Sequence, residues 1–366
     1  MYAIFSVDGG PKRVNHAAAA VGHRIYSFGG HCSDKDYNGS GPIDVHIFDT
    51  LSVRWLQIEY KADSTVTKTP LQRYGHTVVA YGDCIYLFGG RNDNGACNVL
   101  YKFDTVTHVW SQPLVYGLIP NARDGHSSCV VGNSMYVFGG YEDVFDSLSQ
   151  DLFCLNLETF VWMYVPNRGI PPTCRDFHTA SNINGRMYVF GGRSDMDGPV
   201  QTSEESYDSN IVYFDTCTLQ WVVPEVTGEI PEGRRSHSAF VLNDKLYIFG
   251  GYNGDIKQHY NDLYCFNPAK NSWSRSNIKG QLPCPRRRHC CCLIDNRIYI
   301  FGGTSPRLKN WEKFASLTHI QSDVMLVDHS DLYVIDISPN LKTLCLLAVI
   351  ENDMDTNLLP KKIPNI

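Results

Sequence analysis

RVNHAAAAVGHRIYSFGG, residues 13–30, contains a pattern that occurs six times in the chain with fixed spacing. Each Arg-x-x-His is followed, thirteen residues after the His, by the first Gly of a Gly-Gly pair, and each pair ends the motif Tyr-x-Phe-Gly-Gly. The six instances begin at Arg13, Arg73, Arg123, Arg175, Arg234 and Arg286. Successive Gly-Gly pairs lie 50 to 60 residues apart, a period typical of β-propeller blades. The chain is therefore a repeat protein, and its function depends on what differs between the repeats.

Each repeat carries the pattern of four strands. A short apolar stretch after the His, such as residues 17–21, is expected to form the first strand, and Tyr-x-Phe-Gly-Gly the second, after a turn such as Gly132-Asn133. The third strands are expected at Val45–Asp49, Val99–Asp104, Leu152–Asn156, Ile211–Asp215, Leu263–Asn267 and Leu332–Asp336. A Trp is expected to open the fourth strand in five repeats, at Trp55, Trp110, Trp162, Trp221 and Trp273.

These residues resemble the kelch repeat over positions 1 to about 338. The resemblance implies an all-β fold, a β-propeller of six four-stranded blades. The sixth repeat has no Trp and no evident fourth strand, whereas Tyr2–Val7 alternates like a strand and precedes the first Arg-x-x-His. We therefore predict that this N-terminal strand completes the last blade, which closes the ring and removes an exposed sheet edge.

The residues after 338 need a separate explanation, because the N-terminal strand takes their place in the last blade. Ser338-Pro339 is expected to start a helix, with a hydroxyl cap followed by Pro in the first turn. Leu341, Cys345 and Val349 then lie at i, i+4 and i+8, on one face of that helix. This face resembles the BC-box, the elongin-binding helix of cullin-RING ligase substrate receptors. The alternative is an ordinary amphipathic helix that packs on the propeller.

A second motif follows in the tail at Leu359-Pro360-x-x-Ile363-x-x-Ile366. It resembles the cullin-2 box, in which an aliphatic-Pro pair is followed by further aliphatic residues. Two short motifs in this order are more specific than either motif alone. We therefore divide the chain into a six-bladed propeller, residues 1–338, and a short helical tail that carries the two boxes, residues 339–366.

Composition narrows the class of protein. The chain has 13 Cys, an odd number, and its N-terminus lacks the features of a secretory signal. We therefore expect reduced, structural thiols and a location in the cytoplasm, with the nucleus as a second site. Cys290, Cys291 and Cys292 would alternate between the two faces of a strand and could not bind one ion, so we expect no metal and no cofactor. A net charge of −6 disfavours direct binding to nucleic acid, and no apolar run has the length of a membrane span.

The binding surface is expected where the Arg-x-x-His segments open the innermost strands and surround the mouth of the central channel. Arg and His recur in every repeat and are assigned to blade structure, whereas the two residues between them vary. In chain order these pairs are Val14-Asn15, Tyr74-Gly75, Asp124-Gly125, Asp176-Phe177, Arg235-Ser236 and Arg287-Arg288. Blades three and four thus present acids, and blades five and six present bases.

A pocket with opposed charges suits a peptide C-terminus that has a basic side chain upstream. Arg235, and Arg193 directly after the fourth Gly-Gly pair, are the candidates to bind the terminal carboxylate. Asp124 and Asp176 are the candidates to meet a Lys or Arg. Aromatic walls and a hydroxyl beside Arg235 complete the candidate site: Tyr74, Tyr141, Phe177, Tyr252 and Ser236. The alternative is that these acids and bases pair only with each other across neighbouring blades.

Several stretches resemble the kelch-repeat substrate receptors of cullin-2 ubiquitin ligases, among them RRSHSAF at 234–240, ARDGHS at 122–127 and LKTLCLLAVI at 341–350. The resemblance implies recognition of C-terminal degrons that end in Gly. It also implies that the tail hands the bound protein to an assembly of elongin B/C, cullin-2 and its RING subunit for ubiquitination and degradation. In this interpretation the chain is an adaptor and not an enzyme.

Two other functions remain open at this point. A copper enzyme similar to galactose oxidase would need Tyr and His ligands around a metal, and no additional His cluster stands out in the sequence. A kelch scaffold that binds actin, or chromatin in meiotic recombination, is the other alternative, because Asp124 and Asp176 would suit basic histone tails. The long segment 304–330, with Trp311 and Phe314, is expected to be either functional or disordered.

Overall fold

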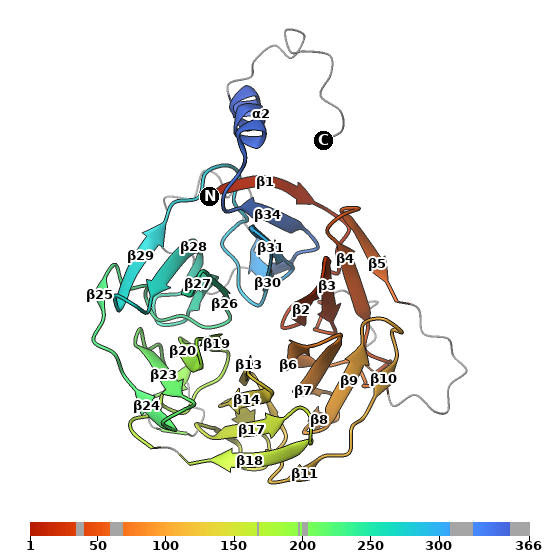
Figure 1. Ribbon diagram of the computed structural model, residues 1–366, viewed down its shortest axis with the longest axis vertical. Helices are drawn as coiled ribbons and strands as arrows, with labels where there is room; N and C mark the ends of the chain where they lie inside the picture. Colours follow the sequence, from red (N-terminus) through yellow and green to blue (C-terminus); the bar gives the residue numbers. More distant parts are fainter. Residues whose placement is uncertain are drawn as a thin grey trace.

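The computed structural model describes residues 1–33, 40–58, 69–166, 168–196, 198–199, 204–307 and 325–351. Six mainly antiparallel sheets stand around a central axis and form a closed ring (Figure 1). The fold is the all-β six-bladed propeller that the repeats predict, and the expected fold class is confirmed. Within the described residues, no helix is long and apolar enough to cross a membrane.

Each blade has four strands, given from the innermost to the outermost. Blade one is β2 (Ala17–Val21), β3 (Arg24–Phe28), β4 (Val45–Asp49) and β5 (Arg54–Gln57). Blade two is β6 (Tyr74–Tyr81), β7 (Cys84–Asn92), β9 (Leu100–Asp104) and β10 (Trp110–Ser111), with β8 (Gly95–Ala96) beside β7. Blade three is β13 (Ser127–Val131), β14 (Ser134–Phe138), β17 (Leu152–Asn156) and β18 (Val161–Val165).

The second half of the ring repeats this order. Blade four is β19 (Thr179–Ile183), β20 (Arg186–Phe190), β23 (Ile211–Asp215) and β24 (Gln220–Val222). Blade five is β26 (Ser238–Leu242), β27 (Lys245–Asn253), β28 (Gln258–Asn267) and β29 (Ser272–Ser276). Blade six is β30 (Cys290–Ile294), β31 (Arg297–Phe301), β34 (Leu332–Asp336) and β1 (Tyr2–Val7). Shorter strands lie between them: β11 (Tyr116–Gly117), β12 (Arg123–Asp124), β15 (Tyr141–Glu142), β16 (Ser147–Leu148), β21 (Ser194–Asp195), β22 (Glu205–Ser206), β25 (Thr227–Gly228), β32 (Thr304–Pro306) and β33 (Leu326–Asp328).

The N-terminal strand closes the ring as predicted. β1 pairs antiparallel with β34, from Tyr2 opposite Asp336 to Val7 opposite Leu332. Four of the six third strands have the predicted bounds, while β9 begins one residue later than expected and β28 extends back to Gln258. The blade that contains both the first and the last strand therefore has no free edge on β34.

Aromatic pairs explain why Phe and Trp recur in the repeats. The Phe of each Tyr-x-Phe-Gly-Gly packs against the Trp of the next blade, with ring centroids 5.0 Å apart for Phe88 and Trp162. The other pairs are Phe28–Trp110, Phe138–Trp221, Phe190–Trp273 and Phe301–Trp55. Blade six lacks the Trp, and there Phe249 shares a buried cluster with Ala3 of β1. The aromatic repeat is thus an interface between blades, which buries apolar surface around the whole ring.

The segments that connect the blades cover the outer edges. β11 and β25 pair in parallel with β18 and β29, the outermost strands of the blades that follow them. Gly117 and Gly228 have φ of 83° and 88°, and a Cβ there would overlap the carbonyl oxygens of Trp162 and Trp273. In blades three to six a Gly stands six residues before the Arg, at positions 117, 169, 228 and 280. Glycine is needed at these positions because the two backbones approach too closely for a side chain.

A buried arginine fixes the entry of the innermost strand in blades two to six. Arg123, Arg175, Arg234 and Arg286 are at most 1% exposed. In Arg175, Nε donates to the Thr173 carbonyl at 3.0 Å and Nη1 donates to the Gly191 carbonyl at 2.8 Å. The same two bonds recur in blades two, three, five and six. A carboxylate then compensates the buried charge, as Glu142 does for Arg123 at 2.6 Å.

The repeated histidines hold neighbouring blades together by side-chain hydrogen bonds. Ser127 Oγ of blade three lies 2.7 Å from His178 Nε2 of blade four, and the same bond joins Thr77 to His126, Thr179 to His237 and Ser238 to His289. Blade one has Ala17 at the hydroxyl position and blade six has Cys290. Accordingly, within the described part of the chain, His76 Nε2 and His16 Nε2 are buried without a hydrogen-bond partner. Burial lowers the pKa of His126 to about 3, so the ring is neutral and its nitrogens need ordinary polar partners.

A helix, α2 (Leu341–Glu351), follows β34 and lies outside the ring, beyond β1 (Figure 1). The expected helix start at Ser338 is wrong. Asn340 is the cap, since its Oδ1 accepts a hydrogen bond from the Thr343 N–H at 2.9 Å, and Ser338 instead donates its N–H to Asp336. Asn340 stands directly before the first turn, so its side chain can accept from a free N–H group there. Ser338 is too far from that turn to do so.

Ala17→Ser should stabilise the propeller, because it supplies the hydroxyl that His76 Nε2 lacks. One added hydrogen bond contributes about 0.5–1.5 kcal/mol to the free energy of unfolding. Ser127→Ala is the matched reverse change, and it should destabilise by about 1–3 kcal/mol because it leaves His178 Nε2 buried and unpaired. Denaturant unfolding of both variants measures the two effects. A loss of stability in Ala17→Ser would show that Ala17 is required for packing instead.

Candidate functional site

The mouth of the channel is a closed ring of backbone hydrogen bonds. The ring consists of the second variable residue of each Arg-x-x-His, and each N–H donates to the carbonyl of the preceding blade. The bonds are Gly75 to Asn15, Gly125 to Gly75, Phe177 to Gly125, Ser236 to Phe177, Arg288 to Ser236 and Asn15 to Arg288, at 2.7 to 3.1 Å. All six residues have φ between 50° and 67°. Four of them are not glycine, so the bonds hold them in a conformation that costs about 1 kcal/mol or more each.

The first variable residue of each segment stands on the rim above this ring. In every blade it pairs with the residue that follows the Gly-Gly pair, as Asp176 pairs with Arg193 and Arg235 with Tyr252. The other four pairs are Val14–His31, Tyr74–Arg91, Asp124–Tyr141 and Arg287–Thr304. The twelve side chains of these pairs form what we call the rim. The predicted candidates Tyr74, Asp124, Tyr141, Asp176, Arg193, Arg235 and Tyr252 all belong to it, and Phe177 and Ser236 belong to the ring.

The channel itself is narrow. A cavity of about 120 Å³ is lined by the six ring residues and by the six repeated histidines. Ligand sites for organic molecules usually measure at least about 300 Å³. The rim, and not the channel, is therefore the surface on which a peptide can be placed.

Two acids of the rim already have partners. Asp176 is 1% exposed and forms an ion pair with Arg193, whose Nη1 also lies 3.3 Å from Glu205. Asp124 lies 3.4 Å from Arg91 of blade two. Burial raises the pKa of Asp124 to about 7, against the opposing charge of Arg91 and with the help of Asp176. The acidic side is thus largely buried, and Arg193 is occupied by carboxylates of the chain itself.

The basic side has a different balance of charge. Arg235 lies 3.0 Å from Glu205, whereas Arg287 and Arg288 form no ion pair with an acid among the described residues. Arg287 packs over the ring of Tyr252 at 4.3 Å, and that ring packs against His259 at 4.5 Å. We call Arg235, Arg287, Arg288, Tyr252 and His259 the basic corner.

Buried polar atoms in the basic corner lack partners. Within the described residues, Arg287 Nε and both ring nitrogens of His259 are buried without a hydrogen bond. Burial, and then repulsion from Arg288 and Arg235, lowers the pKa of Arg287 to about 10. Burial and the three arginines lower the pKa of His259 to about 3, so it is neutral. The three arginines of the basic corner therefore repel one another without enough carboxylates nearby to neutralise them. A bound anion would reduce this repulsion and would accept the hydrogen bonds that the buried nitrogens lack.

Sequence reasoning missed Arg287, Arg288 and His259 as candidate site residues. Arg287-Arg288 was visible as a variable pair, but its lack of acidic partners depends on side-chain positions. His259 gave no signal, because it lies in the N-terminal extension of β28, outside the repeated pattern. The tail candidates divide into two groups. Leu341 is 76% exposed and Cys345 is exposed, while Val349 is half-buried. The candidates Leu359, Pro360, Ile363 and Ile366 lie outside the described residues, as do Trp311 and Phe314.

Similarity to known proteins agrees with the propeller fold. The family model described as the KLHDC2/KLHL20/DRC7 Kelch-repeats domain matches residues 75–303. Kelch domain-containing protein 3 from Bos taurus is 49% identical over 361 residues, covering 98% of this chain and 92% of that protein, and the protein of the same name from Homo sapiens is 48% identical over the same shares. Host cell factor 2 from Homo sapiens is 29% identical over 287 residues, 72% of this chain and 36% of that protein. The chain belongs to the kelch-repeat family, whose propellers are typically non-enzymatic interaction modules, and is related to kelch domain-containing protein 3.

Proposed function

We propose that the chain is the substrate-recognition adaptor of an elongin B/C–cullin-2–RING ubiquitin ligase. It binds the C-terminal degron of a substrate, a free carboxylate on a terminal Gly, and promotes ubiquitination and proteasomal degradation. The observation that carries the proposal is the basic corner, where Arg287 has a buried nitrogen without a partner among the described residues and Arg288 lies close by. A terminal carboxylate has two oxygens and can accept from both guanidinium groups.

Charge and space at the basic corner favour the C-terminus of a peptide as the ligand. An internal peptide segment offers only neutral carbonyls to the two arginines, whereas a C-terminus offers a full negative charge. Arg235 shares Glu205 with Arg193, so it is available to the ligand only in part. Tyr252 supplies an aromatic wall within this corner, and Ser236, next to Arg235 in the chain, supplies a hydroxyl. A terminal Gly has no side chain and lets the carboxylate approach the ring without a clash.

The opposite side of the rim would select the residue upstream. Asp124 and Asp176 lie in the neighbouring blades three and four, and Asp143 adds a partly exposed carboxylate that lies 3.4 Å from Arg91. A Lys or Arg of the degron would meet this side, with Tyr74, Tyr141 and Phe177 as the aromatic walls. The buried ion pairs make Asp176 and Arg193 positioning residues for the rim, and the carboxylate role falls to Arg235, Arg287 and Arg288.

The tail supplies the link to the ligase in this proposal. An amphipathic helix that packed on the propeller would bury Leu341, but that side chain is 76% exposed and Cys345 is exposed too. The Leu341/Cys345 face is therefore available for elongin B/C, with residues 359–366 as the proposed contact for cullin-2. The adaptor performs no bond chemistry, and it accelerates the reaction by holding the substrate near the RING-bound enzyme. We propose the cytoplasm and the nucleus as its locations.

Affinity for two peptides that differ only at the C-terminus tests the pocket. The chain, co-expressed with elongin B/C, should bind a peptide ending in Gly with a free carboxylate more tightly than its amidated form. Arg287→Ala should weaken the free acid by about 10- to 100-fold, because a hydrogen bond to a charged group is worth about 1.5–3 kcal/mol. Isothermal titration or fluorescence anisotropy gives both dissociation constants.

Arg186→Ala is the matched control, since Arg186 lies on β20 and pairs with Asp215 at 3.1 Å, away from the rim. It should leave both affinities unchanged. Equal losses for the acid and the amide in Arg287→Ala would remove this residue from the carboxylate role. If the parent chain does not distinguish the two peptides, the degron pocket is wrong, and binding to histone tails or to actin becomes the next function to measure.

The double change Leu341→Ala and Cys345→Ala should abolish co-purification of elongin B/C. Burial of one Leu side chain in an interface contributes about 1.5–3 kcal/mol, and the Cys face adds to it. The melting temperature should shift by no more than about two degrees, because both side chains are exposed in the free chain. Pull-down with tagged elongin B/C and a thermal melt are the two measurements.

Lys342→Ala changes the exposed neighbour of Leu341 and should leave elongin binding intact. If the double variant still retains elongin B/C, the BC-box assignment is wrong. A cooperative loss of the propeller fold would instead mean that α2 packs on the ring in solution.

A further inference from the structure

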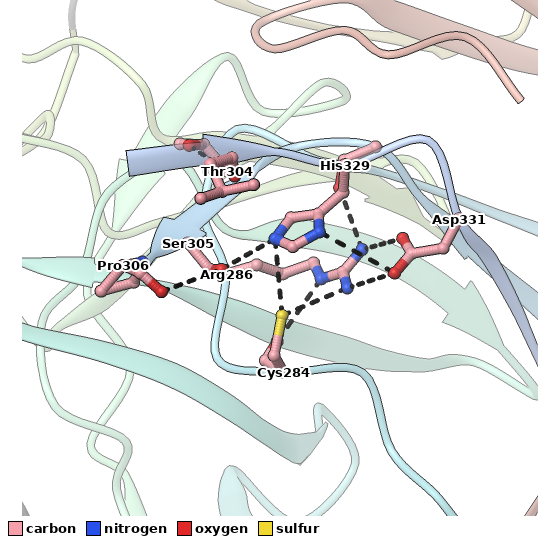
Figure 2. Close-up of polar contacts among 9 residues, drawn as sticks. Cys284, Arg286, Thr304, Ser305, Pro306, His329 and Asp331 are labelled. Atoms are coloured by element: carbon pink, nitrogen blue, oxygen red, sulfur yellow. Dashed lines mark hydrogen bonds and ion pairs between the residues drawn. The ribbon is translucent and has the colours of Figure 1, made fainter. Parts of the chain in front are cut away.

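A cysteine and an arginine two residues apart meet a histidine from a distant segment in blade six, outside the basic corner (Figure 2). Cys284 Sγ lies 3.3 Å from Arg286 Nη2 and 3.5 Å from His329 Nε2. Ser305 Oγ of β32 lies 2.8 Å from the same His329 nitrogen, and Asp331 Oδ2 lies 3.9 Å from His329 Nδ1. We call Cys284, Arg286, Ser305, His329 and Asp331 the thiol cluster. Cys284 is half-buried, so its sulfur is enclosed by polar groups without being sealed in the core.

The arginine in this cluster is held in place by other bonds. Arg286 Nη1 lies 2.6 Å from Asp331 Oδ1 and donates to the Gly302 carbonyl at 3.1 Å, and Nη2 lies 3.0 Å from Asp331 Oδ2. The guanidinium therefore points a fixed N–H at the sulfur. A thiolate accepts such a bond better than a thiol does, because the bond is then charge-assisted on both sides.

Burial and the polar neighbours of Cys284 have opposite effects on the pKa of its thiol. Burial raises the pKa of Cys284, but the bond from His329 and the charges of Arg286 and His329 outweigh it and lower the pKa to about 7. Burial raises the pKa of Cys292 to about 12, and burial together with the neighbouring Cys154 raises the pKa of Cys129 to about 12. Cys284 thus differs from the core cysteines of the same propeller in having donors that stabilise the thiolate.

Blade four contains the hydroxyl version of the same arrangement. Thr173 stands two residues before Arg175, as Cys284 does before Arg286, and its Oγ1 accepts from Arg175 Nη2 at 2.8 Å. Ser194 then lies 3.1 Å from Thr173 Oγ1, in the place that Ser305 takes in blade six. A hydroxyl is sufficient for the structural role of this position. The sulfur and the imidazole of blade six are therefore not explained by the fold alone.

We propose that Cys284 is a modification site, a nucleophilic thiolate that takes small disulfides such as glutathione disulfide. The thiolate attacks one sulfur of the disulfide, and a new S–S bond to Cys284 forms while the original S–S bond breaks. The other half leaves as a thiolate and is protonated by solvent. Cys284 is oxidised and the departing half is reduced, so the exchange balances without a further oxidant. The product sulfur is neutral and no longer offers Arg286 an anionic acceptor.

Mass mapping of the full chain treated with glutathione disulfide tests this site. The reduced chain is incubated at a series of pH values from 6 to 9, quenched with acid and digested. Modification of Cys284 should reach half of its maximal rate near pH 7, and at pH 6.5 it should be about five times faster than that of Cys217, an exposed thiol on a turn. His329→Gln keeps a donor beside Ser305 but removes the imidazole, so it should slow modification of Cys284 at pH 6.5 by about fivefold and shift the profile upward.

Two controls separate reactivity from damage to the fold. Cys284→Thr copies blade four, so it should keep the melting temperature of the parent and lose the adduct. His329→Gln is compared with the parent only where its melting temperature is also unchanged. If it has dropped, His329→Asn, which also replaces the imidazole by an amide, is measured for the same shift. The proposal is overturned if Cys217 is modified and Cys284 is not, or if the rate profile of Cys284 is the same with and without the imidazole.

Discussion

Six backbone hydrogen bonds at the channel mouth set the geometry of the propeller. The bonds run from blade to blade through Asn15, Gly75, Gly125, Phe177, Ser236 and Arg288, and the last one returns to the first. A closed circuit fixes the number of blades, since each residue must reach both neighbours with the same left-handed backbone. The histidine one residue further on packs its ring against the first Gly of the preceding blade, and the arginine two residues earlier anchors to the Gly carbonyl of its own blade. Arg, His and the glycines are therefore parts of one joint that recurs from blade to blade.

This joint also explains why the same positions can carry function. The backbone of the ring is held by bonds that do not depend on side chains, so the residues beside it are free to change from blade to blade. Acids gathered in blades three and four are neutralised by Arg91 and Arg193, whereas the bases in blades five and six are not fully matched. A common framework with unequal side chains turns a symmetric channel mouth into a surface with one preferred orientation for a charged ligand.

The sequence was sufficient to predict the strands and the ring of blades. It was insufficient to predict which charged side chains of the rim pair with each other. The offsets between Arg, His and Gly predicted the strands and the closure by Tyr2–Val7, because each offset corresponds to a fixed length of strand and turn. The rim could be placed for the same reason. Whether Asp176 meets Arg193 or a ligand depends on rotamers a few ångströms apart, which no spacing reveals. The glycines six residues before the Arg in blades three to six were visible, but their meaning required the parallel connectors. At α2, the sequence predicted Ser338 as the cap, whereas the structure uses Asn340, which stands directly before the helix.

The seam between β1 and β34 has a consequence for the order in which the protein is made. β1 is synthesised before the other strands of the ring, whereas β34, with which it forms its ladder, is the last of the described propeller strands to leave the ribosome, so the ring closes only after β34 has been made. α2 begins five residues after β34 and emerges after it. Any protein that docks on α2 therefore meets a nascent chain whose last blade can already be complete, and assembly on the tail follows the folding of the propeller in time.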